Sequence, residues 1–291
     1  MDVRVEKGAA DIQSSGAARV PVNLPVTGSL TLWYVVSLII AILMTIASLA
    51  GLLYSDQLYP TAALRQSFMA TDVVNLLIGL PMLLGSMWFA RRGKLLGLLF
   101  WPGALLYVLY HYIVYTFSLP LNVGFLLALV LLASSAYTTI GLVASIDSRA
   151  VQRRLAGAVP AKFAGRVLFG LGVAFALLVM STIIGALLQG TDIAKAELGL
   201  HVSDFIITQA WIIGGVLLWR REPLGYVTGA GLLFQASMLF VGLLVYFALQ
   251  PLMTASPFPA GDFVAILVMG LVCFVPFGLF VRGVVSKGRT S

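Results

Sequence analysis

The sequence predicts an all-α integral membrane protein with about eight transmembrane helices. Apolar residues make up 60% of the 291 residues and charged residues only 10%, and the mean hydropathy is +1.02. Soluble domains carry about 25% charged residues, whereas a bilayer accepts an apolar outer surface. Crossing it takes about 20 apolar residues. The segments that qualify are 31–54, 68–90, 95–117, 121–145, 164–189, 202–219, 224–249 and 262–282.

Basic residues gather in alternate links between these segments, and this pattern predicts the orientation. Short cytoplasmic loops collect Lys and Arg, so the even-to-odd links and both termini are expected in the cytoplasm, most simply at a bacterial plasma membrane. The net charge of +7 then reflects topology and attraction to anionic lipids rather than nucleic-acid binding. The residues that carry the pattern are Arg91, Arg92, Lys94, Arg149, Arg153, Arg154, Lys162, Arg166, Arg220, Arg221, Arg282, Lys287 and Arg289.

Similar signals recur in the two halves of the chain and favour a tandem duplication of a four-helix unit. Each half has a Thr/Ser-Asp pair, an Arg pair, and a following Leu-Gly with a second glycine six residues on, at Gly103 and Gly231. Four spans per half make the repeat parallel, with its pseudo-two-fold axis along the membrane normal. Chance similarity among Leu-rich helices is the alternative.

The expected organisation follows from the spans and the repeat. It consists of a disordered cytoplasmic tail rich in Gly, Ala, Ser and Pro (1–30), the first repeat (31–145), a basic cytoplasmic linker (146–163), the second repeat (164–284) and a short cytoplasmic tail (285–291).

Two aspartates are the first candidates for a polar site. Asp72 and Asp204 are expected near the outer ends of spans two and six, where they would converge across the pseudo-two-fold axis. The alternative is that Thr71 and Ser203 cap these helices, while each acid complements the positive end of the helix dipole.

Further polar residues on spans two, three and six extend this hypothesis. Asn75 lies three residues after Asp72, on the same helical face. His111 is the one histidine expected inside a span, with Tyr107 one turn before it, and Gln209 follows Asp204 on span six. Intramembrane ionisable residues usually face the bundle interior and are functional. A neutral histidine bonded to a neighbouring tyrosine or carbonyl is the structural alternative.

No catalytic, cofactor or metal motif accompanies these residues. The sequence contains no P-loop, HExxH or GxSxG, and Cys273 is its single cysteine. We therefore expect no cofactor, and a transporter-like or small-molecule-binding protein rather than an enzyme. The expected partners are membrane lipids and a small neutral or lipophilic ligand, held in the outer half of the bundle. A membrane enzyme acting on a lipophilic substrate and a non-catalytic scaffold subunit remain the alternatives.

Overall fold

A computed structural model describes residues 24–253 and 257–287. Within these ranges, eight helical runs are long and apolar enough to cross a membrane, as predicted. They are α1 (Thr31–Leu53), the continuous run of α3 (Ala62–Val74), η1 (Asn75–Gly79) and α4 (Leu80–Arg91), then α5 (Leu95–Ser118), α6 (Val123–Ala144), α8 (Ala161–Gln189), α9 (Lys195–Trp219), α10 (Pro223–Met253) and α11 (Ala260–Lys287). Two short helices, α2 (Ser55–Leu58) and α7 (Ser148–Leu155), lie in links.

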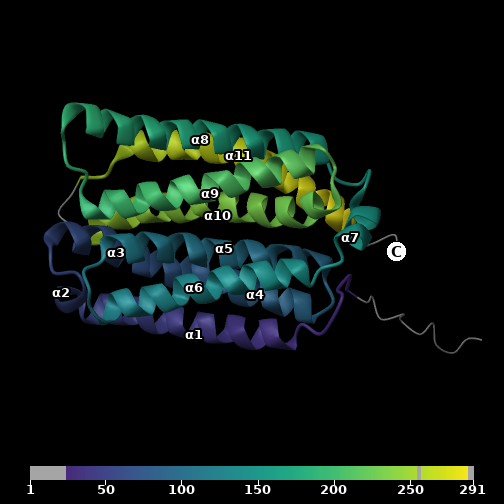
Figure 1. Ribbon diagram of the computed structural model, residues 1–291, viewed down its shortest axis with the longest axis horizontal. Helices are drawn as coiled ribbons and strands as arrows, with labels where there is room; N and C mark the ends of the chain where they lie inside the picture. Colours follow the sequence, from purple (N-terminus) through teal and green to yellow (C-terminus); the bar gives the residue numbers. More distant parts are fainter. Residues whose placement is uncertain (1–23, 254–256, 288–291) are drawn as a thin grey trace, which may run out of the picture.

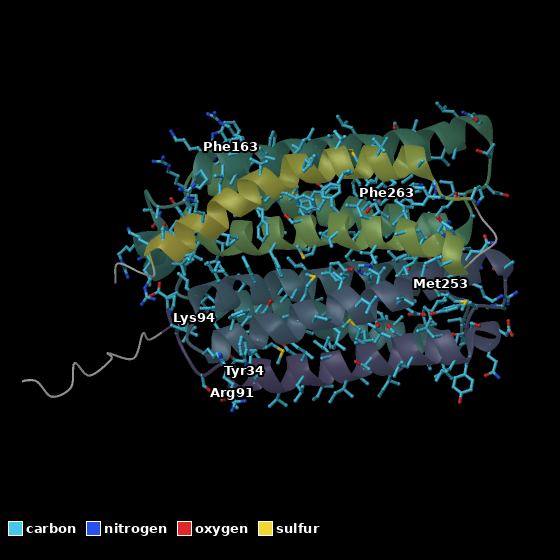
Figure 2. All side chains as sticks on the ribbon, turned by 180° about the vertical axis from the view of Figure 1, so that it is seen from behind. Tyr34, Arg91, Lys94, Phe163, Met253 and Phe263 are labelled. Atoms are coloured by element: carbon cyan, nitrogen blue, oxygen red, sulfur yellow. The ribbon has the colours of Figure 1, made fainter. Side chains whose placement is uncertain are left out.

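The long helices run along one common direction in two groups (Figure 1). One group contains α1 and α3 to α6, and the other contains α8 to α11. The start of α1, the end of α11 and the linker helix α7 lie at the same end of the bundle. Arg91, Lys94 and Phe163 lie toward this end, whereas Met253 and Phe263 lie toward the opposite one (Figure 2).

Each group is a ring of four spans with the same order of neighbours. In the first, α1 packs on α3 and α4, α4 on α5, α5 on α6, and α6 on α1. In the second, α8 packs on α9, α9 on α10, α10 on α11, and α11 on α8. Between the rings, α5 packs on α10, and each of these two helices also touches the second span of the other ring, since α5 packs on α9 and α10 on α3.

The turns from the second to the third span of each ring have the same backbone geometry. The residue after the C-cap has positive φ in both, +72° at Gly93 and +61° at Arg221. In the first turn, Gly93 N–H donates to the Ala90 carbonyl at 2.9 Å. In the second, Arg221 N–H donates to the Leu218 carbonyl at 3.0 Å. Both helices therefore end in the αL-type turn that redirects a chain after a helix.

The second span is distorted where the sequence places a proline. The π-helical turn η1 ends two residues before Pro81. Proline has no N–H for the carbonyl four residues earlier and crowds that carbonyl, so a wider turn is a local way to accommodate it. Pi turns of this kind often occur at functional sites.

Several helices extend past the apolar segments from which they were predicted. Span two begins at Ala62 instead of 68, and α9 begins at Lys195 instead of 202. Hydropathy marks the part of a helix that suits hydrocarbon, whereas the backbone continues as helix through polar residues beyond it. The prediction of a single histidine inside a helical span was therefore wrong, because His201 lies within α9 as well.

Part of the predicted N-terminal tail, together with the start of α1, contacts the end of the first repeat and the start of the linker. Thr27 N–H donates to the Ser145 carbonyl and Asp147 N–H to the Pro25 carbonyl, both at 2.9 Å. The Trp33 indole donates to Ser145 Oγ at 2.8 Å. Residues 1–23 and 288–291, which carry the rest of the two predicted tails, lie outside the described residues.

Candidate functional site

Asp72 lies inside the first ring with only 1% of its surface exposed. Its Oδ2 accepts a hydrogen bond from the Tyr59 hydroxyl and its Oδ1 one from the Tyr115 hydroxyl, each at 2.7 Å. Gly51 on α1 faces this carboxyl group, and a Cβ atom there would overlap Asp72 Oδ2. The glycine therefore makes room for the aspartate between α1 and α5.

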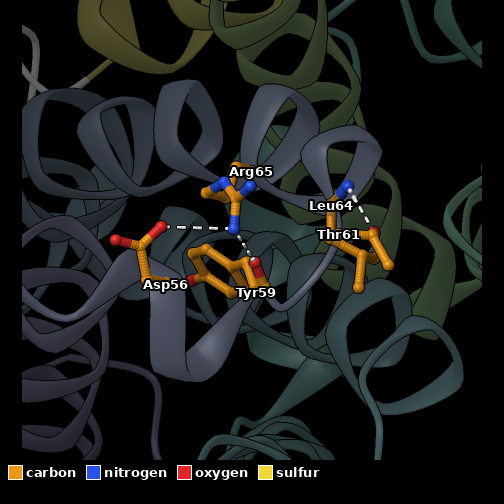
Figure 3. A network of polar contacts seen from close by, with 5 residues as sticks. All are labelled: Asp56, Tyr59, Thr61, Leu64 and Arg65. Atoms are coloured by element: carbon orange, nitrogen blue, oxygen red, sulfur yellow. Dashed lines mark hydrogen bonds and ion pairs between the residues drawn. The ribbon is translucent and has the colours of Figure 1, made fainter.

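Tyr59 lies in the loop between α2 and α3, and its backbone is held by Arg65 from α3 (Figure 3). Arg65 Nη1 donates to the Tyr59 carbonyl at 3.1 Å and lies 3.2 Å from Asp56 Oδ1. Thr61 caps α3 by accepting from the Leu64 N–H. Burial, followed by the negative charge of Asp72, raises the pKa of the Tyr59 hydroxyl. This hydroxyl therefore remains a hydrogen-bond donor at physiological pH.

The alternative reading of Thr71 and Ser203 as helix caps is wrong. Because α3 begins at Ala62 and α9 at Lys195, both residues lie well inside their helices. The Thr71 hydroxyl bonds back to the Ser67 carbonyl at 2.8 Å. The Ser203 hydroxyl donates across to the Tyr110 carbonyl at 2.7 Å, so it links α9 to α5.

Asp204 belongs to a different set of contacts from Asp72. Its Oδ1 accepts from the Tyr110 hydroxyl at 2.8 Å. Tyr110 and Tyr115 both lie on α5, so this central helix supplies a hydroxyl donor to one aspartate in each ring. Asp204 forms no ion pair with any Lys, Arg or His of the described residues.

His111 is fixed from its own helix. Its Nδ1 lies 3.0 Å from the Tyr107 carbonyl oxygen, and since a carbonyl only accepts, Nδ1 carries the hydrogen. The ring contacts Tyr107 and Tyr110, with centroids 4.3 Å and 5.2 Å apart. The structural alternative, a neutral histidine bonded to a neighbouring carbonyl, therefore holds for Nδ1. Nε2 has no hydrogen-bond partner among the described residues.

Asn75 and Tyr107 are buried without hydrogen-bond partners among the described residues. Both side-chain polar atoms of Asn75 and the Tyr107 hydroxyl are in this state. Gly79 and Gly242 admit the Tyr107 side chain, since Cβ atoms there would lie 3.1 Å from its ring and 2.8 Å from its hydroxyl. Each unpaired buried polar group lowers the stability of the fold by about 1–3 kcal/mol, so Asn75 and Tyr107 are retained here at a cost in stability.

A cavity of about 400 Å³ lies between the two rings, where α3, α5, α9 and α10 meet. His111 and Asp204 line it, but Asp72, Asn75, Tyr107 and Gln209 do not. Its walls are mostly apolar, with several aromatic rings. Further lining residues are Tyr110, Phe175, Glu197, Trp211, Phe240, Leu243, Tyr246 and Phe247.

The predicted site residues thus fall into three places. His111 and Asp204 face the cavity, Tyr107 lies behind its Gly242 wall near Asn75, and Asp72 forms a separate buried cluster. Gln209 is half-buried away from the cavity. Glu197 and Trp211 are not among the predicted site residues. Glu197 lies between the predicted segments 164–189 and 202–219, and Trp211 lies within the second of these with no local signal that separates it from its apolar neighbours.

Trp211 is anchored at the cavity wall by a polar contact. Its indole N–H donates to Gln235 Oε1 at 2.7 Å, and Gln235 is fully buried on α10. For metals, the described part of the chain holds no group of three or more His, Cys, Asp or Glu side chains placed to share an ion.

No protein-family model, curated protein or solved structure matches the chain. The class of protein therefore rests on its own sequence and structure. The eight apolar helices of the described residues, packed in two rings, define a polytopic α-helical membrane protein.

Proposed function

We propose that the protein binds a small, predominantly apolar molecule in the cavity between the two rings and acts as a transporter-like membrane protein. The cavity carries the proposal. Ligand sites in proteins are typically 300–1,000 Å³, mostly apolar, with a few polar groups that orient the ligand. The cavity of about 400 Å³ has this character, with Asp204, Tyr110 and His111 as its polar groups.

The relation between the rings supports the transporter-like part. A parallel repeat about a pseudo-two-fold axis requires three features that are present here. The two rings have the same order of neighbours, their turns match, and the contact of α5 with α9 is mirrored by that of α10 with α3. Transporters built from repeats hold their substrate at the interface between repeats. The cavity lies at that interface, between α3 and α5 of one ring and α9 and α10 of the other.

The position of the cavity along the helices is consistent with a site in the outer half. Its lining on α9 runs from Ala196 to Trp211 and stops nine residues before Arg220. If the basic links face the cytoplasm, the cavity lies toward the external side. Both termini would then be cytoplasmic, as expected from the even number of spans.

Direct binding tests the proposal. The protein is reconstituted in nanodiscs of zwitterionic lipid and titrated with phenylbutanol, a neutral lipophilic probe. We expect saturable binding, weakened about tenfold or more when Leu243→Trp fills part of the cavity. Ile213→Trp is the matched control, since Ile213 is 61% exposed and does not line the cavity.

Two results would reject the proposal. One is the absence of saturable binding by phenylbutanol and by its amine analogue. The other is equal weakening by Leu243→Trp and Ile213→Trp, which would locate the probe at the lipid-facing surface. Either result would favour a scaffold role, in which the cavity binds no ligand.

A further inference from the structure

The charges that line the cavity are of one sign. Glu197 and Asp204 contribute two carboxyl groups, and its described lining contains no Lys or Arg. The two acids are seven residues apart on α9, which is two helical turns, so they lie on one face of the helix. Glu197 lies in the exposed first turn of α9 and Asp204 lies about 10 Å further along.

Asp204 retains an oxygen for a ligand. Oδ1 accepts from Tyr110, whereas Oδ2 has no hydrogen-bond donor among the described residues. The nearby imidazole gives its Nδ1 hydrogen to the Tyr107 carbonyl instead. An ionised carboxylate in an apolar site is costly unless it is paired, so a neutral ligand would leave this charge uncompensated.

The remaining walls suit a cation as well as hydrocarbon. Aromatic faces attract ammonium groups through the quadrupole of the ring, and Trp is the most effective. Rings from α5, α8, α9 and α10 surround the cavity, so one aromatic or aliphatic body and one charged head could both be accommodated. They belong to Tyr110, Phe175, Trp211, Phe240, Tyr246 and Phe247.

From these features we infer that the ligand is a lipophilic organic cation, an ammonium group on an aromatic or aliphatic body, with its charge paired to Asp204 Oδ2. The inference rests on the proposed function and names the chemical class of the ligand. Glu197 increases the local concentration of the cation at the mouth of the cavity through its charge, and the aromatic rings hold the body.

The cation inference is tested by measuring the binding of three probes that share one skeleton to the protein in nanodiscs of zwitterionic lipid. Phenylbutylamine and phenylbutyltrimethylammonium carry the charge, and phenylbutanol is neutral. We expect both cations to bind the wild-type protein about tenfold more tightly than the alcohol. In Asp204→Asn this preference should disappear while the affinity for phenylbutanol is retained, because asparagine can still accept from Tyr110.

Asp262→Asn is the matched control for net charge. Asp262 is exposed in the first turn of α11 and does not line the cavity, so this variant should keep the wild-type preference. Retained phenylbutanol binding also shows that Asp204→Asn is folded. If that variant does not fold, Glu197→Gln provides a second measurement and should lower the affinity for both cations without changing that for the alcohol.

The outcomes separate this inference from the proposed function. Equal binding of all three probes, or a preference for cations that survives Asp204→Asn, overturns the cation inference and leaves a site for neutral ligands. An equal loss of preference in Asp262→Asn also overturns it, since the effect would then arise from overall charge. If none of the three probes binds saturably, both the cation inference and the proposed function are overturned.

Discussion

Gly103 and Gly231 meet backbone to backbone where α5 crosses α10. A Cβ atom on Gly103 would overlap the Gly231 carbonyl oxygen, and one on Gly231 would lie 3.2 Å from the Gly103 nitrogen. These are the two glycines that the repeat pattern pairs. Small residues allow transmembrane helices to approach closely, and tight packing is a main source of stability between them. The crossing therefore joins the two rings.

Substitution at this crossing should destabilise the fold. Gly103→Ala introduces a Cβ atom against backbone that cannot move aside, with an expected cost of about 1–3 kcal/mol. Gly170→Ala is the control, since no atom lies within 4 Å of a Cβ there, and alanine favours helix over glycine. Thermal unfolding in detergent should show a lower midpoint for Gly103→Ala only. Equal midpoints would contradict the close contact.

The hydrogen bonds to Asp72 should contribute to stability. Tyr115→Phe removes one of two donors to a fully buried carboxyl group, at an expected cost of about 1–3 kcal/mol in the free energy of unfolding. Tyr54→Phe is the control, because Tyr54 is 57% exposed and its hydroxyl bonds to none of the described residues. Unfolding followed by circular dichroism should show a lower free energy of unfolding for Tyr115→Phe and no such loss for Tyr54→Phe. A loss of the same size in both would show that Tyr115 makes no specific contribution.

Gly51 and Asp72 should be energetically coupled. Gly51→Ala alone is expected to destabilise the protein, because the new Cβ atom overlaps both the carboxyl group and the Tyr59 hydroxyl. Asp72→Ser removes the overlap with the carboxyl group and the bond that holds the Tyr59 hydroxyl there. The loss of unfolding free energy in the double variant should therefore be smaller than the sum of the two single losses by about 0.5 kcal/mol or more. A double-mutant cycle of unfolding free energies measures this coupling. Additive effects would indicate that the carboxyl group does not face Gly51.

The predicted orientation can be tested with single cysteines in a Cys273→Ala background, since Cys273 is buried. A cysteine at Asp192, in the link between α8 and α9, should react with a membrane-impermeant maleimide in intact cells. A cysteine at Lys94, next to the Arg pair, should react only after the cells are opened. Both positions are exposed. The reverse pattern would place both termini outside.

The sequence indicates which polar residues lie in the helical spans, but it does not indicate which side chains they form hydrogen bonds with. Asp72 and Asp204 looked equivalent because each follows Thr or Ser at the start of an apolar segment. In the structure Asp72 bonds to Tyr59 and Tyr115 inside the first ring, whereas Asp204 bonds to Tyr110 and faces the cavity between the rings. Local sequence cannot distinguish these cases, because the donors come from other helices. The π turn at Asn75 had a local signal in Pro81, but the size of the distortion depends on packing.

By itself the sequence determined the membrane class and the eight apolar helical runs, because transfer into hydrocarbon depends on the composition of each segment and on little else. It also predicted that the basic links and both termini face the cytoplasm, since the Lys and Arg content of each short link can be counted without knowing how the helices pack. Only the tertiary structure decided that Asp204 and His111 face a shared cavity, and that Glu197 and Trp211 join them there. Such proximity depends on how helices cross, and those crossings are set by contacts such as Gly103 with Gly231 between segments far apart in the chain.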